Sequence, residues 1–232
     1  MRERRDLSLQ PGNSGTHRAD ATGVTIDVRP VARGEVSEAA LVLARAFAGD
    51  DISVASVARP TDPEPMLAAL FESAIRRHYL RHGVVDVAVD RGRIVGAAVW
   101  AAPGQGDFAP TAYVQMFLDT VRTVRWRLLP LLVQLYRTGR VHPTPPHWYI
   151  YALGVAEPGG GVGGLLLDHG IARAGDVPCF LEASTPDSAR LYARKGFLQI
   201  GTAPTPPGCR YPNQPQMWHD PVAHDERQPR SA

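Results

Sequence analysis

The sequence predicts a single α/β domain in which helices cover a mixed β-sheet. The 232 residues are enough for one domain with a sizeable core and too few for two comfortable ones. Apolar runs typical of strands are interspersed with runs that repeat at helical spacing. In the C-terminal half the order is strand, glycine-rich turn, helix, strand, helix. This order predicts a pair of parallel strands, because parallel strands need a crossover of about a dozen residues between them.

The first part of the domain is expected to hold a strand, two helices and a hairpin. The opening strand alternates apolar and polar side chains and stops near Pro30. Both helices carry apolar residues at helical spacing, and Gly83 is expected to end the second one. Turn residues 90–93 lie between two apolar runs and predict the hairpin. The predicted elements are a strand at 25–31, helices at 35–47 and 66–75, and hairpin strands at 84–89 and 94–100.

The second part is expected to hold a long helix and then two strand–helix pairs. The long helix is amphipathic, and Pro130 is expected to kink or divide it. Five arginines in or near it form either a solvated face or a surface for an acidic group; they are Arg122, Arg125, Arg127, Arg137 and Arg140. The predicted elements are helix 113–136, strand 147–155, helix 165–174, strand 177–183 and helix 187–195. Residues 1–23 and 221–232 lack apolar periodicity and predict disordered tails around a domain at 24–220.

Composition and charge argue against several classes of protein. Hydrophobic residues make up 44% and charged residues 21% of the chain, close to the averages for soluble globular proteins. A net charge of +2 does not call for a nucleic-acid partner, and no apolar run reaches the roughly 18 residues of a membrane span. Cys179 and Cys209 form no Cys-x-x-Cys pair, and with no secretory signal apparent we expect a cytoplasmic protein. The histidines lack metal-ligand spacing with the cysteines, so no metal site is expected.

A run of glycines lies where the strand at 147–155 passes into the following helix. Its members are Gly159, Gly160, Gly161, Gly163 and Gly164. Glycine lets backbone amides approach a ligand with no side chain in between. The first N–H groups of a helix have no intrahelical partner and lie at the positive end of its dipole, so such a junction can bind a pyrophosphate. A flexible turn without a ligand is the other interpretation of the same residues.

Three motifs in the last third of the chain occur together in one protein family. They are HWYIYALGV at 147–155 leading into GVGG at 161–164, PCFLEAS at 178–184, and LYARKGF at 191–197. In these motifs the chain resembles the GNAT N-acetyltransferases, and within them most closely the puromycin N-acetyltransferase type. The resemblance implies the GNAT fold, with a mixed, mostly antiparallel twisted sheet of about six or seven strands flanked by helices. It also implies transfer of acetyl from acetyl-CoA to a primary amine of a small molecule, such as an antibiotic or related metabolite, by a monomer or homodimer.

The same resemblance assigns the coenzyme contacts. The backbone near Leu153 and Val155 would pair with the pantetheine arm, and an N–H there would polarise the acetyl carbonyl. Ser188 stands where many relatives have an asparagine that touches the coenzyme. The turn departs from the family pattern, since Pro158 stands where a Gln or Arg is usual and the link from the strand is about two residues shorter. The residues expected to contact the coenzyme A pyrophosphate are Gly159, Gly161, Val162, Gly163 and Gly164.

Two residues are expected to move protons. An amine must lose its proton before it attacks, and Glu182 is the candidate base because burial at a strand end raises a carboxyl pKa; a purely structural carboxylate is the alternative. Tyr192 lies five residues before Phe197, as the family's acid does, and is the candidate donor to the departing thiolate. A half-buried packing tyrosine is its alternative. Aromatic residues that are candidates for lining the acceptor pocket are Trp100, Tyr149 and Tyr151.

Two other classes of function stay open. The chain could acetylate lysines or N-termini of proteins, which predicts an open acidic groove in place of a closed aromatic pocket. It could also be a sensor that binds acyl-CoA without catalysis, or a relative that binds nothing, as the shortened turn would allow. The identity of the amine is not encoded in any motif of the chain.

Overall fold

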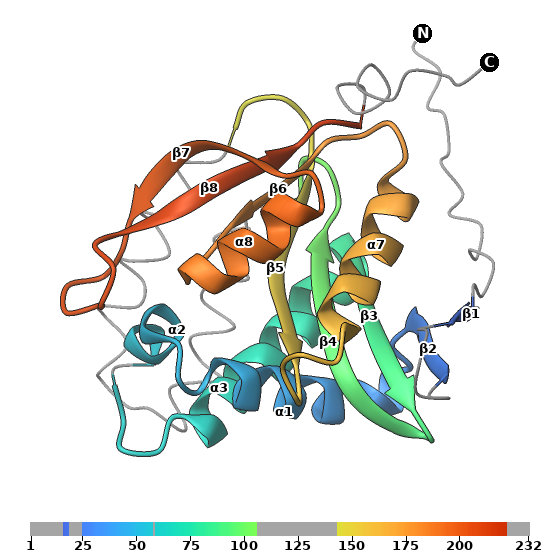
Figure 1. Cartoon of the computed structure of the whole chain (residues 1–232). Helices are drawn as coiled ribbons and strands as arrows, with labels where there is room; N and C mark the ends of the chain where they lie inside the picture. Colours follow the sequence, from blue (N-terminus) through green and yellow to red (C-terminus); the bar gives the residue numbers. More distant parts are fainter. Residues whose placement is uncertain (1–15, 19–24, 58, 106–142, 222–232) are drawn as a thin grey trace, which may run out of the picture.

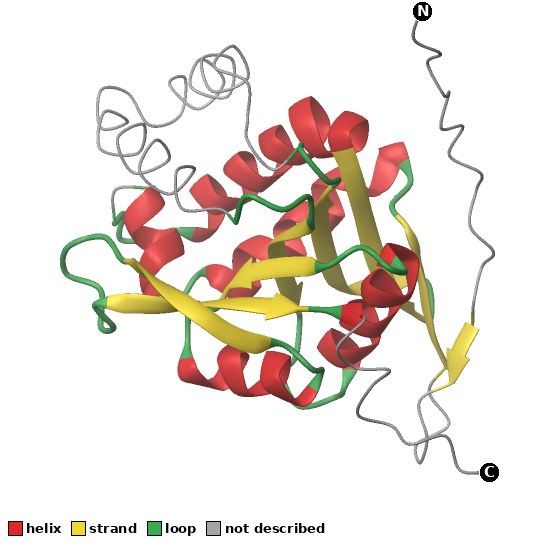
Figure 2. Ribbon diagram, turned by 90° about the horizontal axis from the view of Figure 1, so that it is seen from above, coloured by secondary structure: helices red, strands yellow, loops and turns green. Residues whose placement is uncertain are grey.

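The computed structural model describes residues 16–18, 25–57, 59–105 and 143–221. The helix predicted at 113–136, with the five arginines in or near it, lies outside the described residues. The described chain forms three layers, in which helices cover both faces of one twisted sheet (Figures 1 and 2). This arrangement confirms the predicted α/β fold class.

The sheet has eight strands in the order β1-β2-β3-β4-β5-β6-β8-β7. All neighbouring strands are antiparallel except β5 and β6, which confirms the predicted parallel pair. The additional strand, β1, consists of three residues inside the predicted N-terminal tail. The strands are β1 (Thr16–Arg18), β2 (Thr25–Pro30), β3 (Gly83–Asp90), β4 (Arg93–Ala101), β5 (Trp148–Val155), β6 (Cys179–Glu182), β7 (Leu198–Pro204) and β8 (Asn213–His219).

Helices from the two halves of the chain cover opposite faces of the sheet. One apolar cluster joins α1 and α3 to the sheet, and a second joins it to α7 and α8. Figure 1 shows α7 and α8 in front of the strands and α3 behind them. The helices are α1 (Val36–Phe47), α2 (Asp51–Ser56), α3 (Glu64–Ala74), a π-helix η2 (Ile75–Tyr79), α4 (Leu80–His82), α7 (Val162–Ala174) and α8 (Pro186–Arg194), with a 3₁₀ turn η1 (Arg33–Glu35) before α1.

Local sequence accounts for where several elements begin and end. The β3–β4 hairpin turns through Arg91 and Gly92, both with positive φ, which is the conformation that two-residue hairpin loops favour. Helix α8 begins with a capping box, in which the Thr185 side chain accepts from the Ser188 N–H. Helix α7 begins at Val162, three residues earlier than predicted, because Gly161 takes a left-handed conformation with φ of 75° just before it.

Three strands and one helix of the structure have no counterpart in the sequence predictions. Helix α2 contains no buried residue, so no apolar stripe marks it; Asp50 caps it by accepting a hydrogen bond from the Ser53 N–H at 2.8 Å. Strand β7 lies at the edge of the sheet, where Leu198 and Ile200 are both 53% exposed. Its side chains do not show the alternation that identifies a half-buried strand. The other two unpredicted strands are β1 and β8.

Candidate active site

Strand β5 loses its neighbour on one side soon after it begins. It pairs with β4 from Tyr149 to Val155, but with β6 only at Trp148–Cys179 and Tyr149–Phe180. Beyond Tyr149, one edge of β5 therefore has no strand partner among the described residues. Main-chain groups along such an edge are free to pair with an extended ligand. Leu153 and Val155, the residues predicted to hold a pantetheine arm, lie in this part of β5.

A β-bulge at Tyr151 accompanies the loss of pairing. Val99 pairs with Ala152 and Trp100 pairs with Ile150, so Tyr151 is an extra residue on β5. Tyr151 and Ala152 consequently pack on the same side, against the α1–α3 cluster. A bulge bends its strand and increases the local twist, and this one lies two residues past the end of the β5–β6 pairing at Tyr149.

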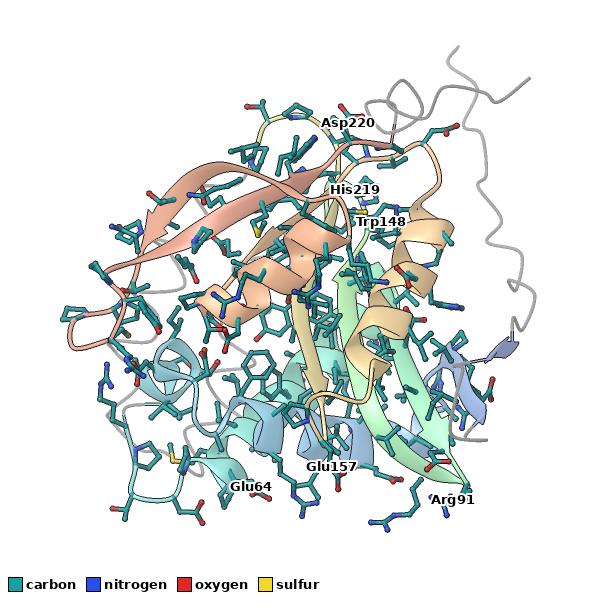
Figure 3. The ribbon with its side chains drawn as sticks, viewed as in Figure 1. Glu64, Arg91, Trp148, Glu157, His219 and Asp220 are labelled. Carbon is teal, nitrogen blue, oxygen red and sulfur yellow. The ribbon has the colours of Figure 1, made fainter. Side chains whose placement is uncertain are left out.

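The glycine turn lies at the other end of β5. Figure 3 places Trp148 and Glu157 at opposite ends of this strand, with Glu157 in the turn that leads to α7. Residues 156–161 are exposed, and Gly159 and Gly161 have positive φ values of 96° and 75°. A Cβ on either glycine would meet no atom within 4 Å, so space is open beside both. The turn can therefore approach a ligand closely through its backbone.

Among the described residues, no side chain caps the N-terminus of α7. Gly161 provides no side-chain cap, and the first turn contains no acidic residue. The first intrahelical bond described runs from the Leu165 N–H to the Gly161 carbonyl at 3.1 Å. The N–H groups of Val162, Gly163 and Gly164 are left without intrahelical partners, as at any helix start. These amides and the helix dipole together favour an anion.

Glu182 is a buried carboxyl group with two neighbouring donors. The Tyr149 hydroxyl donates to its Oε2 at 3.4 Å, and the Gln216 amide donates to its Oε1 at 3.5 Å. Burial raises the pKa of Glu182 above its ordinary value of 4.5, and these two long hydrogen bonds only partly oppose the effect. Glu182 is the last residue of β6, just past the point where β6 stops pairing with β5. A carboxylate with a raised pKa is a stronger base than an ordinary glutamate.

Tyr192 lies on the opposite face of the sheet from Glu182. It belongs to the apolar cluster under α7 and α8, 8% exposed, with its ring 5.9 Å from that of Phe197. Burial raises the pKa of the Tyr192 hydroxyl to about 12. The phenol therefore keeps its proton across the physiological pH range and can act as a hydrogen-bond donor. The tyrosine of the LYARKGF motif is therefore more buried than the half-buried packing position considered from the sequence.

The three aromatic residues predicted to line an acceptor pocket are not brought together. Tyr149 and Tyr151 pack against the α1–α3 cluster, and Tyr149 stacks on Phe180 with ring centroids 6.0 Å apart. Trp100 points to the other face, where it is 0% exposed among the residues under α7. A side chain with no exposed surface packs as core, so the structure separates Trp100 from the two tyrosines. The alternation of strand residues between faces explains the separation.

Polar side chains at the two ends of α8 have partners within the protein. The Ser188 hydroxyl donates to the Thr185 carbonyl at 2.8 Å as part of the α8 capping box, and Ser188 lies one helical turn before Tyr192. Lys195, the only lysine in the chain, donates to Asp168 at 2.5 Å. Its Nζ would lie 3.5 Å from a Cβ placed on Gly164, so it stands beside the first turn of α7. The pairing of Lys195 with Asp168 could not be predicted from the sequence, because it is a tertiary contact between the end of α8 and α7.

No group of three or more His, Cys, Asp or Glu that could hold a metal ion occurs in the part of the chain that the structure describes. Among the same residues, no helix is long and apolar enough to cross a membrane.

No protein-family model matches this sequence. A crystal structure from Corynebacterium glutamicum, described as histone acetyltransferase HPA2 and related acetyltransferase, is 32% identical with a TM-score of 0.65. The match covers 88% of this chain and 98% of that one. The chain belongs to the GNAT family of acetyltransferases. Like other GNAT proteins of this kind, it is an acyltransferase.

More distant GNAT structures share the fold. A polyamine N-acetyltransferase from Drosophila melanogaster is 20% identical, with a TM-score of 0.53 over 84% of this chain and 99% of that one. Arylalkylamine N-acetyltransferase 2 from Aedes aegypti is 15% identical, with a TM-score of 0.58 over 84% of this chain and 98% of that one. At these identities the likeness supports the GNAT fold and leaves the acceptor open.

The raised pKa of Glu182 predicts a pH-dependent effect on stability. Between 4.5 and the higher pKa of the folded state, the folded protein binds more protons than the unfolded one, so stability falls as the pH rises through this range. Glu182→Gln does not titrate and avoids this loss. We expect the variant to melt at a higher temperature than the wild type at pH 8, and to lose this advantage at pH 4.5. Asp187→Asn, at a side chain 83% exposed, is the control; an equal difference at both pH values would contradict the assignment.

Proposed function

We propose that this GNAT acyltransferase transfers the acetyl group of acetyl-CoA to a primary amine of a small molecule. The observation that carries the proposal is the junction of β5 and α7, where the exposed glycine turn follows a strand edge that has no strand partner among the described residues. Glu182 and Tyr192 lie on opposite faces of the sheet. In acyl transfer, a carboxylate can accept the proton of the amine and a phenol can donate a hydrogen bond to the leaving thiolate.

The residues present fit the coenzyme. The amides of Val162, Gly163 and Gly164 would hold its pyrophosphate, with Gly159 and Gly161 leaving room for the close approach. The free edge of β5 at Leu153 and Val155 would pair with the pantetheine arm. Acetyl-CoA supplies the activated acetyl thioester when it is bound. The space beside Gly159 and Gly161 supports coenzyme binding by the shorter link at Pro158, because a Cβ on either glycine would meet no atom within 4 Å.

Glu182 would take the proton of the incoming ammonium. An alkylamine has a pKa of about 10, like that of lysine, so near neutral pH it is almost entirely the ammonium ion. The ammonium ion has no lone pair and cannot attack a carbonyl carbon. The ordinary pKa of a glutamate is too low for an efficient base at pH 7, and burial corrects this in the required direction. Tyr149 and Gln216 would hold the carboxylate in place through their hydrogen bonds. An N–H of β5 would meanwhile stabilise the negative charge that develops on the carbonyl oxygen.

Tyr192 would donate to the sulfur that leaves. A thiol has an ordinary pKa of about 8.5, well below that of this buried phenol, so the hydroxyl stabilises the thiolate chiefly as a hydrogen-bond donor. The proton that finally neutralises the thiolate can pass through the same hydroxyl as it is replaced from solvent. Packing against Phe197 holds the ring in one orientation.

A small-molecule acceptor is supported by the motifs shared with the puromycin N-acetyltransferase type, and an antibiotic or related metabolite fits that resemblance. The half-buried ring of Tyr149, which packs on the fully buried Phe180, lies beside Glu182 and offers an apolar surface next to the proton acceptor. Such a surface suits a compact amine with an apolar body. Peptide substrates are included in the test below, because the match from Corynebacterium glutamicum is described as histone acetyltransferase HPA2 and related acetyltransferase.

The first test is calorimetric titration with acetyl-CoA, followed by a thiol-release assay against a panel of small amines and lysine-containing peptides. We expect binding, and release of free thiol with at least one small amine. Absence of heat at millimolar acetyl-CoA would overturn the enzyme proposal, and release with peptides alone would assign a protein acceptor.

The same titration tests the glycine turn. Gly161→Ala should weaken acetyl-CoA binding about tenfold, because alanine is strained at φ of 75° by roughly 1–2 kcal/mol. Gly160→Ala is the matched control, since its φ is not positive and a Cβ there meets only Val162 at 4.0 Å. Equal affinities for the two variants would remove the turn from the binding site.

Tyr192→Phe tests the donor role. Removal of one hydroxyl should lower kcat about 100-fold, the size of a typical general-acid contribution, and leave acetyl-CoA affinity nearly unchanged. The phenyl ring retains the contact with Phe197, so the fold should persist. A variant that turns over at the wild-type rate would exclude Tyr192 from the chemistry.

Glu182→Gln tests the base role through the pH profile of kcat/KM. In the wild type the rate should rise with pH through the raised pKa of Glu182, because only the carboxylate accepts a proton. In the variant this rising limb should disappear and the remaining rate should be low. A profile of unchanged shape would assign the proton to another group or to water.

A further inference from the structure

A buried polar cluster lies under the C-terminal half of α7, away from the proposed active site. The Asp86 carboxylate on β3 is 0% exposed and accepts a hydrogen bond from Arg173 of α7 at 2.7 Å. The Arg173 guanidinium lies 5.5 Å from the ring centroid of Trp100 and 5.6 Å from that of Trp148. His169, one turn earlier on α7, has its Nε2 3.8 Å from the second Asp86 oxygen. The cluster thus joins the helix to the middle of the sheet.

Packing α7 through this buried ion pair has a high desolvation cost. Burying an ion pair costs desolvation that its attraction often fails to recover, and apolar residues of similar size are commonly as stable or more so. Several of its polar atoms are buried without a hydrogen-bond partner among the described residues: Asp86 Oδ1, Arg173 Nε and Nη2, and Trp100 Nε1. Hydrophobic packing would stabilise α7 more simply. A role in fixing the position of α7 explains the presence of the ion pair, whereas a role in stability alone does not.

A steric contact reinforces the ion pair. A Cβ added to Gly170 of α7 would lie 1.9 to 2.5 Å from three atoms of the Trp100 ring, a distance that real Cβ atoms do not show. Glycine at this position therefore sets how closely α7 approaches β4. Gly96 plays the corresponding part near the start of the helix, where a Cβ would lie 2.9 Å from Leu166 and 3.0 Å from Val162.

A helix transmits displacement from one end to the other. Gly163 and Arg173 are 173 − 163 = 10 residues apart, which is about 15 Å at 1.5 Å per residue. Apolar packing is non-directional and tolerates small slides, whereas an ion pair between two defined atoms opposes them. A shift of α7 on the sheet would carry its N-terminal amides with it.

We propose that Asp86, Gly170 and Arg173, here called the α7 anchor, are positioning residues that hold the N-terminal amides of α7 level with the edge of β5 beyond Tyr149, with the Trp100 ring as the surface that Gly170 approaches. The inference rests on the proposed function, because it assigns the anchor a role in binding acetyl-CoA. None of the three residues belongs to the groups proposed above to contact the coenzyme or the amine. They act through the placement of α7, and binding geometry tolerates errors of about 1 Å poorly.

The first experiment displaces the helix and then lets it return. Gly170→Ala should raise the Kd for acetyl-CoA, measured by calorimetry, and the KM for acetyl-CoA by about tenfold or more. Adding Trp100→Leu removes the ring atoms that the new methyl group meets, so the double variant should recover most of the affinity. Gly49→Ala, where a Cβ meets nothing within 4 Å, is the matched control and should bind as the wild type does. The KM for an accepted amine should be unchanged throughout.

The second experiment separates position from stability. The apolar pair Asp86→Val with Arg173→Met removes the ion pair without leaving one charge buried and unpaired. We expect a melting temperature at or above that of the wild type, together with a Kd for acetyl-CoA that stays raised about tenfold. A merely structural anchor predicts instead that affinity follows the melting temperature. If Gly170→Ala does not fold, the Asp86→Val/Arg173→Met variant alone decides the question. If that double variant does not fold, Gly170→Ala and its combination with Trp100→Leu decide it.

The outcomes distinguish this inference from the proposed function. Wild-type affinity in both Gly170→Ala and the apolar pair would overturn the anchor while the wild type still binds acetyl-CoA. No heat from the wild type itself would overturn the proposed function, and the anchor's role with it. Loss of affinity in Gly170→Ala without recovery in the double variant would also count against the anchor, because displacement by the methyl group would not be the cause.

Discussion

Strands β5 and β6 form two residue pairs and then diverge, and the layout of the site depends on this interruption. Parallel strands normally continue to exchange hydrogen bonds along their shared length. Here the bulge at Tyr151 bends β5, and β6 ends at Glu182. Beyond Tyr149, this edge of β5 has no strand partner among the described residues, and the glycine turn leads from the end of the strand into α7. A bulge in one strand and the short length of the next thus coincide at the proposed site.

Burial acts in the same direction on the two titratable side chains but serves different purposes. It raises the pKa of Glu182, which makes the carboxylate a stronger base, and it raises the pKa of Tyr192 to about 12, which keeps that hydroxyl protonated. The proton affinities of these two side chains, on opposite faces of the sheet, are thus both set mainly by desolvation. Pairs of groups whose environments give them different proton affinities are a common basis for acid–base assignments.

Sequence periodicity predicted the elements that bury one clear face. Helix α1 and the β3–β4 hairpin follow the expected ranges closely, because their apolar spacing and turn residues agree with their tertiary contacts. The glycine turn was also placed correctly between β5 and α7. The bulge at Tyr151, the exposed strand β7 and the position of Trp100 could not be predicted. They depend on strand register, on which edge stays unpaired and on which face α7 covers, and these are properties of the assembled sheet.

The pairing of Lys195 with Asp168 has a practical consequence for chemical labelling. Lys195 is the only lysine in the chain, and its amine stands at the contact between α8 and the first turn of α7. Amine-directed reagents therefore find one side-chain target in the whole protein. An adduct on this side chain would report on the contact between the end of α8 and the first turn of α7. An acetyl-transferring protein of this composition also offers almost no lysine to modification by its own donor.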